Sequence, residues 1–142
     1  MKKAAIIVNS KTGITRQYAE EISYYLLSKG LDTQVSSIQA YSEDMLNSVD
    51  YVLFGSWTNG LMVILQHPEK EWVDFAAKLP PMPDVKVALF TTYKILTGSM
   101  FRNMYKQLKG KFPAPSLELK SRNGSLSSAD KLELDSIIEQ II

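Results

Sequence analysis

The chain has no cysteine and a single histidine among its 142 residues. The absence of cysteine excludes disulfide bonds, thiolate nucleophiles, zinc fingers and cysteine-ligated iron–sulfur clusters. A single histidine makes a histidine metal cage or a histidine-centred triad difficult to assemble. We therefore expect the chemistry to come from backbone groups, hydroxyls, aromatic rings and a bound cofactor.

The sequence also lacks a large excess of either charge and lacks a long apolar run. Its net charge of +1 argues against a nucleic-acid-binding or membrane-surface module. No stretch approaches the roughly 20 apolar residues of a membrane span, and the first apolar run ends at Asn9, too early for a secretory signal. We expect a cytoplasmic protein that binds neither nucleic acid nor membrane, with one domain over residues 1–142.

Short apolar runs alternate with amphipathic segments along the whole chain. Strands are expected at 4–8, 33–38, 51–54, 85–90 and 116–119, and helices at 13–29, 42–46, 68–78, 97–109 and from 127 onward. This alternation predicts an α/β fold whose five-stranded parallel sheet is covered by helices on both faces. The first, third and fourth strands are apolar throughout and the second and fifth are mixed, so the second and fifth are expected at the edges of the sheet. The strand order 2-1-3-4-5 satisfies this pattern, and we expect that order.

In this topology a ligand lies at the carboxyl ends of the first and third strands. Ser10, Thr12 and Thr15 surround Gly13 where the first strand leads into a helix. Hydroxyls and free N–H groups at a helix N-terminus bind phosphate well, but the same residues are also typical of a simple helix cap. Neither the G-x-x-x-x-G-K-S/T motif nor the G-x-G-x-x-G motif is present, which argues against a P-loop nucleotidase and a dinucleotide site.

One aromatic residue stands in each of the two neighbouring segments. Trp57 follows the third strand and Tyr93 follows the fourth, each among small or hydroxyl-bearing residues. Trp57 could cover the protein's own surface, or both rings could face a planar ligand. Together with the phosphate loop, two such rings specify a flat, aromatic, phosphorylated ligand.

Residues 10–15 resemble the phosphate motif Ser/Thr-x-Thr-Gly-x-Thr of the flavodoxin family, and residues 96–99 resemble its continuation after the stacking Tyr. The resemblance implies the flavodoxin-like three-layer sandwich and non-covalent FMN between Trp57 and Tyr93. It also implies a monomeric one-electron carrier that cycles between oxidised, semiquinone and hydroquinone states with separate redox partner proteins. The residues then expected to bind the cofactor are Ser10, Lys11, Thr12, Gly13, Ile14, Thr15, Ser56, Trp57, Thr58, Asn59, Gly60, Thr91, Thr92, Tyr93 and Gly98.

The chain departs from the family pattern in three respects. Ile14 stands where the family commonly has Asn, and Thr58 stands where it often has the Gly of a peptide that flips on reduction. Residues 9–15, 56–66 and 91–104 contain no Asp or Glu, whereas electron-carrier flavodoxins are strongly acidic. Without that negative charge we expect a less negative second reduction potential and a less stable semiquinone.

Two other functions remain open from the sequence. One is an FMN-dependent NAD(P)H:quinone-type oxidoreductase, and the other is a flavin-free interaction module with the same fold. The sequence argues strongly against a phospho-signalling receiver, because Asn9 and Ser10 stand where it needs an acidic pair, and Gly55 and Ser56 stand where it needs an Asp. No catalytic residue and no metal ligand is assigned.

Overall fold

The structure is a computed structural model that describes residues 2–58, 70–94 and 98–141. Its sheet consists of β1 (Lys3–Asn9), β2 (Asp32–Ser37), β3 (Tyr51–Trp57), β4 (Lys86–Thr92) and β5 (Leu117–Ser121). All pairs are parallel, and the order β2-β1-β3-β4-β5 confirms the expected order, with the two more polar strands at the edges.

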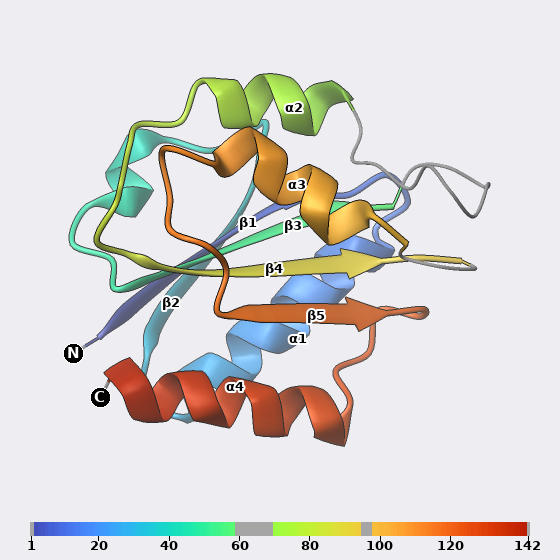
Figure 1. The fold of residues 1–142 in the computed structure, drawn as a ribbon. Helices are drawn as coiled ribbons and strands as arrows, with labels where there is room; N and C mark the ends of the chain where they lie inside the picture. Colours follow the sequence, from blue (N-terminus) through green and yellow to red (C-terminus); the bar gives the residue numbers. More distant parts are fainter. Residues whose placement is uncertain (1, 59–69, 95–97, 142) are drawn as a thin grey trace.

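Helices cover both faces of this sheet (Figure 1). They are α1 (Ile14–Ser28), the short 3₁₀ helix η1 (Glu43–Leu46), α2 (Lys70–Ala77), α3 (Met100–Leu108) and α4 (Ser128–Ile141). Buried residues of α1 and α4 pack on one face, and buried residues of α2 and α3 pack on the other. None of the helices within the described ranges is long and apolar enough to cross a membrane.

The central strands are apolar because both of their faces are buried. In β1, Ile6 and Val8 belong to the core under α1 and α4, whereas Ile7 belongs to the core under α2 and α3. Successive side chains of a strand point to opposite faces, so a continuous apolar run is needed to fill both cores. The more polar β2 and β5 lie at the two edges of the sheet.

β3 and β4 extend two or three residues beyond the ends expected from the sequence, to Trp57 and Thr92. The sequence pattern predicts that the third strand ends at residue 54, but Gly55 continues the ladder opposite Phe90. A Cβ on Gly55 would lie 2.1 Å from two atoms of the Phe90 ring, so this strand position admits no side chain. Glycine here provides space for a neighbouring ring and does not end the strand.

The starts of two helices expected from the sequence, at residues 68 and 97, lie outside the described residues. α1 begins at Ile14, because Gly13 has φ +93° in the left-handed region and acts as the residue before the helix. In α3, the buried residues Met100, Met104 and Leu108 recur every four positions, as expected for a helix with one face in the core.

Candidate functional site

The carboxyl ends of the strands bring three polar segments together at one edge of the sheet. Asn9 of β1 pairs with Ser56 of β3, which pairs with Thr91 of β4. All three are at most 2% exposed. Neighbouring strands lie about 4.8 Å apart, so the loops that follow them form one continuous surface. We call this surface the carboxyl edge.

Ser10 shapes the loop that joins β1 to α1. Its Oγ accepts hydrogen bonds from the N–H of Gly13 (3.1 Å) and the N–H of Arg16 (3.2 Å). The capping role considered for this loop is therefore present. The N–H groups of Ile14 and Thr15 precede the first helical hydrogen bond, which Gln17 makes to Gly13, and have no partner among the described residues. Free N–H groups with no acidic residue in the first turn of α1 suit an anion.

Thr15 connects this loop to the end of β4. Its Oγ1 lies 2.5 Å from the Oγ1 of Thr92, and both residues are buried. Two hydroxyls in one hydrogen bond use one hydrogen and leave the other free to donate. The pair therefore offers a further donor beside the loop. Lys11, Thr12 and Gly13 are exposed, and a Cβ on Gly13 would meet nothing within 4 Å.

Hydrogen bonds join the ends of β3 and β4. The N–H of Thr58 donates to the carbonyl of Thr92 (2.9 Å), and the Thr58 and Thr91 hydroxyls are 2.9 Å apart. The Thr91 hydroxyl also donates to the carbonyl of Ser56 (2.5 Å). These contacts fix the backbone on both sides of Trp57.

Trp57 and Tyr93 lie on adjacent strand ends, because Trp57 pairs with Thr92 and Tyr93 is the next residue. Both rings are half-buried. The indole Nε1 of Trp57 is buried and has no acceptor among the described residues. A cation lies against each ring: the Lys11 Nζ is 4.8 Å from the Trp57 ring centroid, and the Arg122 Cζ is 5.4 Å from that of Tyr93.

The loop after β5 contributes residues that the sequence interpretation did not assign to the site. The carbonyl of Ser121 accepts from the N–H of Tyr93 (3.2 Å), and its hydroxyl accepts from the N–H of Gly124 (3.0 Å). This turn places Arg122 against Tyr93. Its position directly after β5, another strand of the same parallel sheet, was the signal that could have included it.

Asn9 is a second residue that the assignment left out. Its side-chain Nδ2 is buried and has no hydrogen-bond partner within the described part of the chain. A buried amide donor without a partner is costly. Asn9 ends β1 and lies immediately before residues 10–15, which we call the phosphate-type loop.

The remaining residues of the expected site are distributed as follows. Gly98 has φ +49° and lies just before α3. Asn59 and Gly60 lie outside the described residues. Within those described, no group of three or more His, Cys, Asp or Glu side chains could hold a metal ion.

Comparisons with known proteins give one family match and several structures of similar fold. A sequence model described as Flavodoxin matches residues 6–121. A comparison with curated proteins found no match. Among solved structures, a two-electron-reduced Megasphaera elsdenii flavodoxin is 21% identical with a TM-score of 0.72, covering 92% of this chain and 94% of its own.

Two further structures cover nearly the whole chain. A Fusobacterium nucleatum flavodoxin bound to flavin mononucleotide is 12% identical with a TM-score of 0.71, covering 100% of both chains. A flavodoxin from the domain Archaea is 21% identical with a TM-score of 0.64, covering 98% of this chain and 95% of its own. At these identities the structures support the three-layer fold.

Proposed function

Because this chain belongs to the flavodoxin family, we propose that it binds one FMN non-covalently at the carboxyl edge and carries electrons between redox partner proteins. The observation that carries the proposal is the convergence of three features on that edge. The phosphate-type loop lies at the N-terminus of α1, and Trp57 and Tyr93 end two adjacent strands of the same sheet. Such a set suits a ligand that is both anionic and flat.

The described residues fit FMN on three points. The N–H groups of Ile14 and Thr15 and the spare hydroxyl hydrogen of the Thr15–Thr92 pair are donors for the phosphate. The Trp57 and Tyr93 rings are the stacking surfaces for the isoalloxazine ring. The third point is the buried Nε1 of Trp57, a donor that lacks an acceptor among the described residues and is therefore available to a ligand. The flavin itself supplies the one-electron chemistry, passing between its oxidised, one-electron-reduced and two-electron-reduced forms.

The structures found by comparison support the proposed cofactor. The Fusobacterium nucleatum protein is bound to flavin mononucleotide, and the Megasphaera elsdenii protein was solved in a two-electron-reduced form. We transfer FMN binding and the redox cycle to this chain as part of the proposal. A single domain and a cytoplasmic location belong to the same proposal.

The charges near the two rings bear on the reduction potentials. Lys11 and Arg122 lie against Trp57 and Tyr93, and no carboxylate stands in the segments around them. Positive charge favours the anionic, fully reduced flavin. We therefore propose a less negative second reduction potential than an acidic flavodoxin has, to be measured by redox titration of the FMN-loaded protein.

A flavin titration tests the proposed function directly. The purified protein should show a flavin absorption band, or should acquire one on addition of FMN, and should quench FMN fluorescence with a 1:1 end point. Riboflavin, which lacks the phosphate, should bind more weakly. No binding at micromolar FMN would disprove the proposal, and steady turnover of NAD(P)H and a quinone without a separate reductase would assign the chain to the oxidoreductases.

A further inference from the structure

The segments of the carboxyl edge contain cations and no carboxylates. The described residues 9–15, 56–58, 91–94, 98–104 and 121–129 contain four of the 16 Lys and Arg residues and none of the 15 Asp and Glu residues. The four are Lys11, Lys94, Arg102 and Arg122, which we call the cationic rim. Since the net charge of the chain is +1, the rest of the protein carries −3 against the +4 of these segments.

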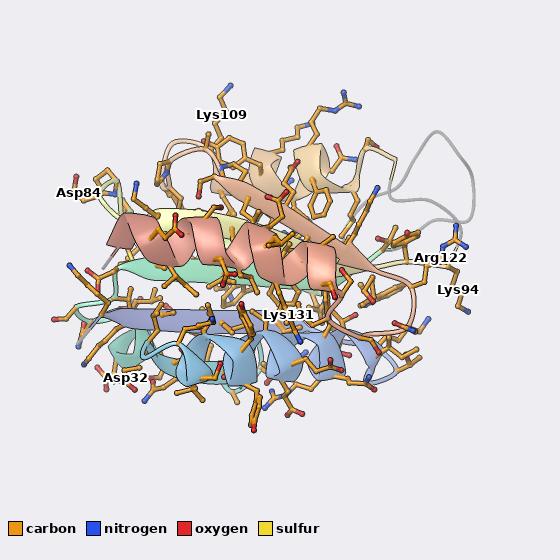
Figure 2. All side chains as sticks on the ribbon, turned by 90° about the horizontal axis from the view of Figure 1, so that it is seen from below. Asp32, Asp84, Lys94, Lys109, Arg122 and Lys131 are labelled. Atoms are coloured by element: carbon orange, nitrogen blue, oxygen red, sulfur yellow. The ribbon has the colours of Figure 1, made fainter. Side chains whose placement is uncertain are left out.

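The rim is exposed and lies at one end of the molecule. Figure 2 shows Lys94 and Arg122 projecting together at the end where the strands terminate, with Asp32 and Asp84 at the opposite end. All four rim residues are solvent-exposed. Arg102 lies in the first turn of α3, where the positive end of the helix dipole adds to its charge.

The rim charges are not neutralised by other described residues. The two ion pairs of the described chain are Lys2–Asp50 and Arg16–Glu20, and neither includes a rim residue. Lys11 and Arg122 instead contact aromatic rings, and a cation retains its full charge in such a contact. The rim residues therefore present positive charge to solvent at this end, while the carboxylates that contact the loop after β5, Asp130 and Glu21, accept hydrogen bonds from the N–H groups of Ser127 and Leu126.

We propose that the cationic rim is the docking surface for an acidic redox protein, an inference that rests on the proposed electron-carrier function. A partner must approach the flavin through the carboxyl edge, because Trp57 and Tyr93 end their strands there. At physiological ionic strength charges act over about 8 Å, so a protein at that edge experiences the rim. An acidic face is attracted and oriented, whereas a basic face is repelled.

Two acceptor proteins of opposite charge test this proposal. The FMN-loaded protein is reduced anaerobically with one equivalent of dithionite and mixed with either cytochrome b5, which is acidic, or cytochrome c, which is basic. In each case the ferric haem takes one electron from the reduced flavin and becomes ferrous, which gives a visible absorbance change. The second-order rate constant is measured at ionic strengths from about 0.02 to 0.5 M, a range over which screening of exposed charges becomes nearly complete.

The two acceptors should respond to salt in opposite directions. Reduction of cytochrome b5 should slow about tenfold or more as salt rises, and reduction of cytochrome c should accelerate or stay constant. The double variant Lys94→Gln/Arg102→Gln, whose side chains contact neither ring in the described structure, should slow the cytochrome b5 reaction at low salt roughly threefold to tenfold. Lys109→Gln is the matched control, because Lys109 is exposed, follows the C-terminal end of α3 and lies away from Lys94 and Arg122 (Figure 2), and it should leave both rates unchanged.

A binding measurement provides a readout that needs no electron transfer. The affinity of the oxidised, FMN-loaded protein for oxidised cytochrome b5 is measured by calorimetry at low and high salt. We expect binding at low salt that weakens in the double variant and not in Lys109→Gln. Equal salt dependence for both cytochromes, an unaffected double variant, or tighter binding to a single-stranded oligonucleotide than to cytochrome b5 would overturn the proposal.

The experiment separates failure of this inference from failure of the proposed function. A protein that does not bind FMN cannot be loaded, and this result defeats the proposed function before any acceptor is added. A protein that binds FMN and reduces both cytochromes with the same salt dependence remains an electron carrier. In that case the acidic-partner inference alone is wrong.

Discussion

The hydroxyl of Thr15, at the start of α1, lies 2.5 Å from the hydroxyl of Thr92, at the end of β4. This contact spans 77 positions of sequence and joins the phosphate-type loop to the segment that holds Tyr93. Two parts of the proposed flavin site therefore share one buried hydrogen bond. Their positions are coupled, so a change in either residue should affect both.

Thr15→Val and Thr92→Val remove these hydroxyls while preserving the shape of the side chain. Each should lower the free energy of unfolding by about 1–2 kcal/mol, because the partner hydroxyl is left buried without its hydrogen bond. The double variant should lose less than the sum of the two single losses. Urea unfolding of the four proteins measures this coupling.

The same variants should weaken FMN binding about tenfold, which corresponds to one lost hydrogen bond to a charged group. Riboflavin binding should change less, because riboflavin has no phosphate. Thr33→Val is the control. The Thr33 hydroxyl is also buried, but it donates to the carbonyl of Leu31, just before β2. Equal losses for FMN and riboflavin would remove Thr15 and Thr92 from the phosphate site.

Trp57→Ala and Tyr93→Ala should each weaken both FMN and riboflavin, because both ligands have the same ring system. A stacked aromatic pair contributes about 0.5–1.5 kcal/mol beyond its buried area, so we expect a loss of at least threefold to tenfold. The measurement is quenching of flavin fluorescence. Tyr24→Ala, at a position 78% exposed on α1, should have no effect, and unchanged flavin affinity in both site variants would contradict the stacking.

Gly55→Ala should destabilise the protein by about 1–3 kcal/mol, because the new methyl group overlaps the Phe90 ring in a closely packed core. Adding Phe90→Leu should recover part of the loss, since it removes the ring atoms that the methyl group meets. Gly30→Ala has open space and strains only the backbone at φ +94°, so it should cost about 1 kcal/mol. Chemical denaturation compares the three, and a Gly55→Ala protein as stable as the parent would show that the strands can separate there.

Tyr18 should make the protein sensitive to alkaline pH. Burial, followed by the hydrogen bond to Asp130 (2.8 Å), raises the pKa of the Tyr18 hydroxyl well above its usual 10. The folded state therefore retains this proton at pH values where the unfolded state has lost it. By linkage, the contribution of Tyr18 to the free energy of unfolding is fully present below pH 10 and decreases progressively as the pH rises above 10.

Removal of the Tyr18 hydroxyl should separate the effect of its hydrogen bond at neutral pH from the effect of its raised pKa at alkaline pH. Tyr18→Phe should cost about 1–3 kcal/mol at pH 7, because Asp130 loses a donor, and should flatten the decline in stability above pH 10. Tyr24→Phe, on the exposed face of α1, should change neither. Denaturation midpoints from pH 7 to 11 provide the measurement, and an equally steep decline in Tyr18→Phe would assign alkaline sensitivity to other groups.

The sheet topology was predictable because burial leaves a direct record in the sequence. β1, β3 and β4 are buried on both faces, and β2 and β5 lie at the edges, so apolar content separated the central strands from the edge strands. The phosphate-type loop was also predictable, since its residue types act locally at one helix N-terminus. The strand ends were not, because Gly55 is typical of a turn until Phe90 is known to fill the space beside it.

The sequence by itself therefore determined the alternation of strands and helices, the edge positions of β2 and β5, the loop at α1 and the lack of Asp and Glu in residues 9–15, 56–66 and 91–104. Only the tertiary structure decided that Thr15 reaches Thr92, and that Arg122, from the loop after β5, lies against Tyr93. The physical reason is that local patterns report on burial and on neighbours along the chain. Contacts between strand ends depend on register and on loop paths, which are set by the packing of the whole sheet.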